Sequence, residues 1–210
     1  MYHRCGQRLL DLVLTLFGLL VLGPLLLAVA LLVRKKIGAP VFFRQQRLGK
    51  DGQPFAVIKF RTMTDARDAG GILLPDDQRM TRVGRFLRRT SLDELPELLN
   101  VLRGEMSLVG PRPLFVHYAE RYTPEQMRRH AVRPGLTGWA QVNGRNAIAW
   151  EEKFAYDLWY VGHQSLLFDL KIICLTVGQV LRRSGINEVG HATMSEYMGA
   201  AHSPDSGMAA

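Results

Sequence analysis

The longest apolar run of the chain lies between Leu9 and Val33, and Asp11 is its one charged residue. About 25 residues at about 1.5 Å each would reach about 37 Å as a straight helix, enough to cross a bilayer. Gly23 and Pro24 interrupt this run near its middle. Because proline removes a backbone hydrogen bond and clashes with the preceding turn, we expect the helix to bend sharply there.

Basic residues flank the apolar run on both sides: Arg4 and Arg8 precede it, and residues 34–36 follow it. Since basic flanks favour the cytoplasmic side, both ends are predicted to stay there. This predicts a re-entrant membrane helix-break-helix over residues 1–36, with an ordinary spanning helix that tolerates its proline as the alternative. An acid at this depth is costly unless paired, so Asp11 is expected to pair with Arg8.

The pattern after residue 36 predicts a small cytoplasmic domain. Two strand-like runs between residues 40 and 63 surround the turn signal at residues 50–53 and predict a β-hairpin. Its second run places a set of alternating side chains on one side, namely Phe55, Val57, Lys59 and Arg61.

Helical signals follow. Residues 64–80 are polar and predict a loop, and residues 81–89 predict a short basic helix. A helix with its leucine face inward is predicted from Leu95, Leu98, Leu99 and Leu102. Another helix is predicted with Thr123 as its cap and Pro124 at its first position, followed by an irregular glycine-rich stretch at 133–145.

The aromatic-rich segment 149–183 fits amphipathic helices lying in the head-group zone, or equally helices that bury these aromatics in a core. The predicted fold is therefore α/β-containing and mainly helical. It comprises a re-entrant anchor over 1–36, a catalytic domain over 37–190 and a flexible tail over 191–210.

The 210-residue chain has a net charge of +8 and a pI of about 9.9, which favours an anionic partner such as nucleic acid, lipid head groups or a phosphorylated substrate. Cys5 and Cys174 lack the spacing of a zinc site and predict no disulfide framework. A reducing cytoplasmic setting fits both observations.

Adjacent acids, Asp93 and Glu94, stand at the start of the leucine-patterned helix. One interpretation is a capping box from Ser91 to Glu94, with both acids complementing the helix dipole. The other is a reactive site, because the nearby arginines exceed what two acids need for neutralisation and suit phosphate. These arginines are Arg85, Arg88, Arg89 and Arg103.

Arg112 stands between Pro111 and Pro113. The two prolines restrict the backbone, so the guanidinium is presented with little entropy left to lose, which suits bidentate phosphate binding. A plain proline-rich turn is the alternative. Together with the acids, this turn predicts a diphosphate site at the bilayer surface, in which Mg²⁺ bridges carboxylate and phosphate.

Several motifs resemble the bacterial sugar transferases known as small monotopic phosphoglycosyl transferases: the break at Pro24, "KFRTM", "TSLDELPELLNVLRGEMSLVGPRP" and "RPGLTGWAQVNGR". The resemblance covers residues 1 to about 200. It implies transfer of a sugar 1-phosphate from a UDP-sugar to a polyprenyl (undecaprenyl) phosphate, with release of UMP and the start of a lipid-linked glycan. It also implies Mg²⁺ as cofactor and the bacterial inner membrane as location, with the catalytic domain and both termini on the cytoplasmic face.

The same resemblance implies roles for single residues. Asp93 would be the nucleophile that attacks the β-phosphorus and would contact the metal, and Glu94 would assist as base for the lipid phosphate. Relatives usually place a serine before the helix-breaking proline, where this chain has Gly23. Asp157 and Asp169 resemble family positions without an assigned role. Substrate-binding residues by this likeness are Lys59, Arg88, Pro111, Arg112, Pro113 and Arg145.

The rival hypothesis is a membrane-tethered basic adaptor that binds anionic lipid or nucleic acid without catalysis. It explains the charge but not the placement of the acids and Arg112, so the partners expected are a UDP-sugar, polyprenyl phosphate and membrane lipids, and no nucleic acid. A homo-oligomer is left open. Residues 186–200 resemble relatives that use N-acetylated deoxyamino sugars.

Overall fold

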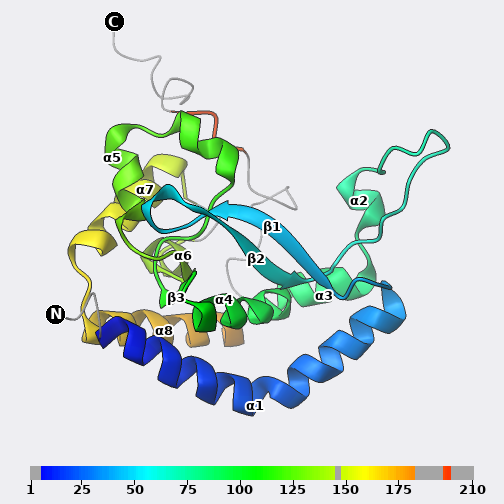
Figure 1. Cartoon of the computed structure of the whole chain (residues 1–210), viewed down its shortest axis with the longest axis horizontal. Coiled ribbons are helices and arrows are strands. Elements are labelled where there is room, and N and C mark those ends of the chain that lie inside the picture. Colours follow the sequence, from blue (N-terminus) through cyan, green and yellow to red (C-terminus); the bar gives the residue numbers. More distant parts are fainter. Residues whose placement is uncertain (1–5, 145–147, 183–195, 200–210) are drawn as a thin grey trace, which may run out of the picture.

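The computed structural model describes residues 6–144, 148–182 and 196–199. Its longest element is α1 (Gln7–Lys36), a single helix that continues through Pro24. Figure 1 shows this helix bent near its middle, so that both of its ends rise toward the rest of the molecule. The predicted break at Gly23 and Pro24 is therefore a bend in an uninterrupted helix. By length and composition α1 could cross a membrane.

The first half of α1 buries a polar stripe. Gln7, Asp11 and Thr15 follow at intervals of four residues on one helix face, and all three are buried. The carboxylate of Asp11 accepts hydrogen bonds from the Ser107 hydroxyl and the Leu108 amide, both at 2.9 Å. The stripe therefore faces the protein, and the helix cannot expose it to lipid without losing these bonds.

Arg8 does not pair with Asp11 as predicted. Its guanidinium donates instead to the carbonyl oxygens of Val101 and Leu102. Carbonyls at the end of a helix lack partners within the helix, which makes them good acceptors for a cation. The prediction of an Arg8–Asp11 pair is wrong because both side chains have better partners in the domain.

The second half of α1 packs through apolar side chains. Val29 and Val33 are buried against Phe60 and Leu87. The outer surface of the helix stays apolar, and its exposed large side chains are Leu9, Val13, Leu16, Phe17, Leu20, Val21, Leu25, Leu27, Leu31 and Leu32.

The predicted hairpin is confirmed. β1 (Phe42–Leu48) pairs antiparallel with β2 (Pro54–Phe60), and a short 3₁₀ turn, η2 (Lys50–Gly52), connects them. Asp51 takes a left-handed conformation in this turn, with φ at 55°.

Residues 64–75 contain no helix, in agreement with the predicted loop, and four short helices rather than two follow before β3. The predicted basic helix is α3 (Arg82–Arg89), capped by Thr81, and a single turn, α2 (Asp76–Arg79), precedes it. The leucine pattern predicted one helix, but a 3₁₀ helix, η3 (Leu92–Glu97), leads into α4 (Leu98–Arg103). Pro96 lies inside η3, where it has no N–H to continue the pattern.

The middle of the domain is built around a small parallel pair, β3 (Ser107–Val109) with β4 (Gly135–Thr137). β4 and a helical turn, α6 (Trp139–Val142), lie in the stretch that was predicted to be irregular. The predicted cap at Thr123 is confirmed by a capping box on α5. The remaining elements here are η4 (Val116–Arg121), α5 (Pro124–Met127) and η5 (Arg128–Ala131).

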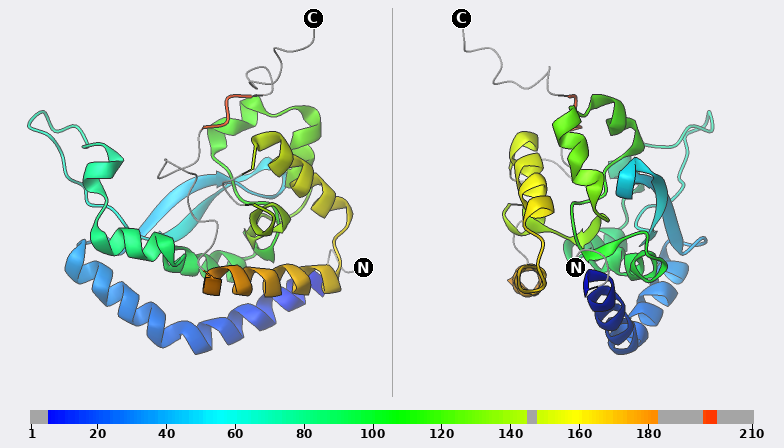
Figure 2. Two further views of the ribbon diagram at one scale, coloured as in Figure 1. Left: turned by 180° about the vertical axis from the view of Figure 1, so that it is seen from behind. Right: turned by 60° about the vertical axis from the view of Figure 1, so that its left-hand side comes forward.

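The aromatic-rich segment forms two helices, as predicted, and part of its aromatic set is buried in the core. α7 (Trp150–Gly162) buries Phe154 and Tyr160 in the core, whereas α8 (Leu166–Arg182) leaves much of its apolar surface exposed, as at Leu167. Figure 2 shows α8 at the same edge of the molecule as the first half of α1.

A short piece near the C-terminus, residues 196–199, lies against the domain. Tyr197 is buried beside Tyr118 and Phe154. This piece of the predicted flexible tail is therefore packed, and the rest of the tail lies outside the described residues.

Candidate active site

The adjacent acids Asp93 and Glu94 lie on η3, which begins directly after Ser91. Ser91 has φ at 55° and its side chain makes no capping hydrogen bond. This left-handed residue precedes η3, and the Glu94 side chain pairs with Lys59 on β2 instead of capping a helix end. The capping-box interpretation is therefore wrong, and the acids are available to the site.

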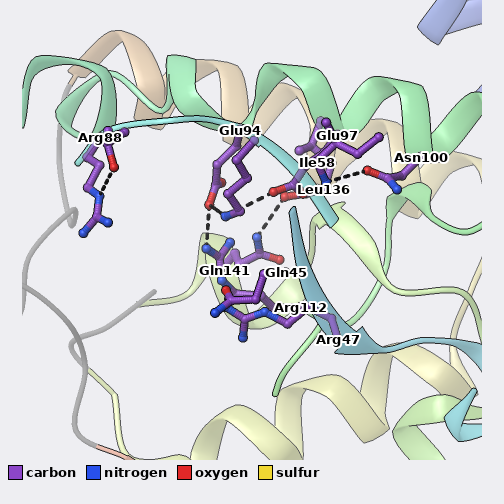
Figure 3. A network of polar contacts seen from close by, with 12 residues as sticks. Gln45, Arg47, Ile58, Arg88, Glu94, Glu97, Asn100, Arg112, Leu136 and Gln141 are labelled. Carbon is purple, nitrogen blue, oxygen red and sulfur yellow. Dashed lines mark hydrogen bonds and ion pairs between the residues drawn. The ribbon is translucent and has the colours of Figure 1, made fainter. Parts of the chain in front are cut away.

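Glu94 forms ion pairs with two basic side chains. Its Oε1 lies 2.6 Å from Lys59 Nζ and 2.7 Å from Arg112 Nη2. Burial opposes ionisation, but the guanidinium of Arg112 and the ammonium of Lys59 outweigh it and hold the pKa of Glu94 well below its usual range. The structure thus brings together three of the predicted site residues, which come from η3, β2 and the Pro-Arg-Pro turn. Figure 3 shows Glu94 and Arg112 of this group.

Asp93 differs from its neighbour. It is buried and forms no ion pair with any residue in the described ranges. Burial, and next the charge of Glu94, raise the pKa of Asp93, while Lys59 and Arg88 partly oppose this shift. A carboxylate that is desolvated and not tied to a cation is the more nucleophilic of the two, provided that a bound group keeps it ionised.

A third carboxylate, Glu97, was missed in the sequence. It is 3% exposed and lies 3.1 Å from Lys59 Nζ, so that Lys59 is shared between two glutamates. Burial raises the pKa of Glu97 to about 7, against the opposing effect of Lys59. Its spacing of three residues from Glu94 was the available signal, because residues three apart lie on one side of a 3₁₀ helix.

The buried amide of Asn100 holds β2 against α4. It accepts from the Ile58 amide at 3.1 Å and donates to the Ala56 carbonyl at 2.8 Å. These bonds fix the strand residues directly before Lys59. Asn100 was also missed, because it stands within the leucine pattern of α4, where a polar residue looks solvent-facing.

Arg88 lies on α3 close enough to lower the pKa of Asp93, and its Nε donates to Thr62 Oγ1 at 3.2 Å. α3 approaches Thr62 closely because Gly84 has no side chain: a Cβ there would lie 1.9 Å from the Thr62 carbonyl oxygen. The other arginines of the predicted cluster are exposed and do not reach the acids, namely Arg85, Arg89 and Arg103.

The backbone of Arg112 is held in place by its buried neighbour Pro111 and by a hydrogen bond from Arg129. Pro111 is buried, and the Arg112 carbonyl accepts a hydrogen bond of 2.8 Å from Arg129. Arg129 is itself paired with Asp157 at 2.6 Å, and both side chains are buried. Asp157, whose role the sequence left open, thus helps to position the Pro-Arg-Pro turn.

Two further predictions concern the edge of the site. Pro113 lines a small cavity of about 10 Å³ together with Lys59, Glu97 and Arg112. Arg47 from β1 lines the same cavity and was missed in the sequence. Arg145 lies outside the described residues.

The carboxylates fit a cation that arrives with a phosphorylated substrate. Mg²⁺ commonly binds through one or two carboxylates plus substrate phosphates. Asp93 offers such a carboxylate, whereas Glu94 is already paired with cations. No cluster of three or more His, Cys, Asp or Glu side chains suited to a resident metal occurs among the described residues.

Asp169, the second acid without a predicted role, lies away from this site. It is buried, and it accepts hydrogen bonds from the Tyr160 hydroxyl at 2.8 Å and from Gln7 at 3.4 Å. These bonds connect α8 to α7 and to the start of α1. Asp169 therefore helps to join α1 to the rest of the domain.

Comparison with known proteins gives a consistent result. Residues 2–183 match the family described as "Bacterial sugar transferase". The chain is 54% identical over 193 residues to the uncharacterized sugar transferase EpsL of Bacillus subtilis (strain 168), covering 92% of this chain and 96% of that protein. It is 45% identical over 192 residues to the exopolysaccharide production protein PSS of Rhizobium leguminosarum bv. phaseoli, covering 84% of this chain and 96% of that protein.

A longer relative has a defined activity in its name. The UDP-glucose:undecaprenyl-phosphate glucose-1-phosphate transferase of Escherichia coli (strain K12) is 44% identical over 185 residues. The match covers 83% of this chain but 40% of that protein. The chain thus spans less than half of this relative.

Proposed function

Because the chain belongs to the bacterial sugar transferase family, we propose that it transfers a sugar 1-phosphate from a UDP-sugar to undecaprenyl phosphate and releases UMP. Relatives named as UDP-glucose:undecaprenyl-phosphate glucose-1-phosphate transferases support this reaction. The observation that carries the proposal is the unequal pair of acids: Glu94 is held by two cations, while Asp93 beside it is buried and unpaired among the described residues.

In the first step, a carboxylate oxygen of Asp93 attacks the β-phosphorus of the UDP-sugar. The bond from this phosphorus to the bridging oxygen breaks, and UMP leaves with the electron pair. The sugar phosphate is then joined to Asp93 as an acyl phosphate, which splits one difficult displacement into two. Arg112 and Arg88 lie where they can stabilise the charge on the transferred phosphate.

In the second step, an oxygen of undecaprenyl phosphate attacks the same phosphorus, and the Asp93 carboxylate leaves. The product is a lipid-linked diphosphate sugar, and any proton that the lipid phosphate still carries passes to Glu94. The ion pairs of the free protein make Glu94 a weak base. A phosphate that competes for Arg112 and Lys59 would loosen these pairs and raise the basicity of Glu94.

Mg²⁺ bound with the diphosphate at Asp93 would neutralise phosphate charge and favour the ionised carboxylate. Cation dependence is tested by chelation: UMP release should stop with EDTA and return with added Mg²⁺. Undiminished turnover in EDTA would contradict the metal requirement but leave the transfer reaction in place.

We also propose that α1 enters and leaves the membrane from one side, with the domain and both termini at the cytoplasmic face of the bacterial inner membrane. The bend in α1, the basic residues 34–36 and the exposed apolar surface of α8 support this arrangement. Reporter tags at the two termini test it, and tags in opposite compartments would contradict it.

The reaction is tested by UMP release from UDP-sugars in the presence of undecaprenyl phosphate and Mg²⁺. We expect ping-pong kinetics and, without the lipid, a phosphosugar adduct that mass spectrometry locates on Asp93. An adduct on another residue, or kinetics that require both substrates bound together, would contradict the covalent step. A basic adaptor would release no UMP at all.

The same assay with a panel of UDP-sugars identifies the donor. The relatives of Escherichia coli and Xanthomonas campestris are named for glucose, whereas the C-terminal resemblance favours an N-acetylated deoxyamino sugar. Residues 186–195 of that segment lie outside the described residues, so the panel decides between the two.

A further inference from the structure

β1 carries an arginine whose charge has no counter-ion among the described residues. The Arg47 guanidinium donates to Gln45 Oε1 at 2.7 Å and lies 3.6 Å above the ring of Phe115. Both partners are neutral, and no carboxylate of the described chain lies at ion-pairing distance from Arg47. A half-buried cation held by neutral groups can bind an anion at little cost in side-chain entropy.

The strand register directs Arg47 toward the active site. Gln45 pairs with Val57 and Arg47 with Phe55, two and four residues before Lys59 on the neighbouring strand. Because side chains alternate between the faces of a hairpin, Gln45, Arg47 and Lys59 lie on the same face. Figure 3 shows Gln45 and Arg47 grouped with Arg112 on one side of Glu94.

Backbone pairing holds this arginine beside the Pro-Arg-Pro turn. The Leu48 amide donates to the Leu114 carbonyl at 3.0 Å, and Arg47 forms an antiparallel bridge with Phe115. Leu114 and Phe115 follow the turn that contains Arg112 almost directly. The two arginines are thus placed together by main-chain contacts rather than by a shared acid.

Arg47 differs from its two neighbouring cations in its pairing. Lys59 and Arg112 are ion-paired with Glu94 and Glu97, whereas Arg47 forms no ion pair among the described residues. Burial, and next the positive charge of Arg112, lower the pKa of Arg47 to about 10. Two neighbouring guanidinium groups repel each other, and an anion bound between them would relieve this repulsion.

We propose that Arg47 and Arg112 together bind a phosphate group of a substrate, with Gln45 and Phe115 orienting Arg47. This inference rests on the proposed function and extends it to a residue outside the sequence motifs. A phosphate could come from the nucleotide sugar or from the lipid carrier, and both offer the same chemistry to a pair of guanidinium groups.

The test compares Arg47→Met with Arg44→Met in the full-length protein in lipid nanodiscs. Arg44 is an exposed arginine on the opposite face of the same strand and serves as the matched control. Methionine keeps much of the apolar stem that covers Phe115 but removes the charge. We expect KM for one substrate to rise about 10- to 100-fold in Arg47→Met, with KM for the other substrate nearly unchanged.

The source of the phosphate follows from which KM changes. A higher KM for the UDP-sugar, together with about equally weakened inhibition by UMP, assigns Arg47 to the nucleotide. A higher KM for undecaprenyl phosphate assigns it to the lipid. A folded Arg47→Met variant whose KM values both match those of Arg44→Met overturns the proposal, and Arg47→Gln is measured in the same way if the methionine variant does not fold.

Direct binding separates this inference from the proposed function. Calorimetric titration of UMP and of a short-chain polyprenyl phosphate compares wild type with Arg47→Met without any turnover. If wild type releases no UMP, the proposed reaction fails. A loss of binding in Arg47→Met alone would still support the phosphate site, and equal binding of both ligands by the two proteins would overturn it.

Discussion

Two charged groups meet at Arg112, and they are built differently: the group behind the turn is buried, and the group in front is partly exposed. Behind the turn, Asp157 and Arg129 form one closed pair, with contacts of 2.6 Å and 3.0 Å between them. Arg129 Nη2 also donates to the Arg112 carbonyl. In front of the turn, the Arg112 side chain belongs to a crowded group of several acids and cations, in which Lys59 serves two carboxylates at once.

The difference teaches how a structural ion pair is distinguished from a reactive group. In the pair of Asp157 and Arg129, one negative charge balances one positive charge. The group in front contains three carboxylates whose pKa values are driven apart: well below the usual range for Glu94, to about 7 for Glu97, and upward for Asp93. Titratable groups with such divergent pKa values mark acid-base or nucleophilic chemistry better than burial alone does.

The largest effect is expected for Asp93→Asn, which removes the proposed nucleophile. Turnover should fall at least about 1000-fold, equivalent to about 4 kcal/mol in the barrier. Since burial raises the pKa of Asp93, its ionised form costs stability at neutral pH, and the neutral amide should leave the melting temperature unchanged or higher. UMP release and thermal unfolding measure both. Turnover equal to that of wild type would end the nucleophile assignment.

Asp157→Asn should mainly lower the stability of the protein, whereas Asp93→Asn should mainly lower its turnover. It leaves Arg129 buried beside a neutral group, so the free energy of unfolding should fall by about 3–5 kcal/mol. Thermal unfolding in detergent measures the loss, with the exposed Asp77→Asn as the matched control. Turnover should fall less than in Asp93→Asn, because Asp157 acts through the position of Arg112. An unchanged melting temperature would refute the structural role.

Lys59→Met should change both the rate and its pH dependence. Without the ammonium, Glu94 and Glu97 lose a charge that favours their ionised forms, so their pKa values rise. We expect turnover to fall about 10- to 100-fold and the acidic limb of the pH–rate profile to move to higher pH. A profile that keeps its wild-type midpoints would show that Lys59 does not control these carboxylates.

The smallest effect is expected for Glu97→Gln. The pKa of Glu97 is about 7 in the folded protein, against an ordinary value of 4.5. Between these values the folded state keeps a proton that the unfolded chain releases, so the contribution of Glu97 to stability is lost as pH rises from 4.5 through 7. Melting temperature measured across this window should fall less steeply in Glu97→Gln. An unchanged slope would place the pKa of Glu97 outside it.

The sequence predicted the hairpin and the Thr123 cap, because strand alternation and capping are local properties that few tertiary contacts override. The site was predicted in two ways: the restricted prolines singled out Arg112 beside the acids, and the family resemblance added Lys59. Glu97 and Arg47 were missed for different reasons. Glu97 looked like part of an α-helix, whereas the left-handed Ser91 and Pro96 make a 3₁₀ helix that aligns residues three apart.

Arg47 needed information that no local pattern carries. Its position beside Arg112 depends on pairing between β1 and the segment after the Pro-Arg-Pro turn, more than 60 residues later. The predicted Arg8–Asp11 pair was wrong for the same reason. A helical spacing shows which side chains of one helix can come into contact, but not whether a distant part of the chain offers either of them a better partner. Here Asp11 binds Ser107, and Arg8 binds carbonyl groups of α4.

The polar stripe of α1 bears on how the protein can be handled. A shortened chain that starts after Lys36 would leave Ser107 and the Leu108 amide without their acceptor, and Phe60 and Leu87 without their cover. A water-soluble protein obtained by removing α1 would have lost part of its core, because this helix is not a separable membrane tether. Purification should therefore keep the helix and supply an amphiphile for its outer surface.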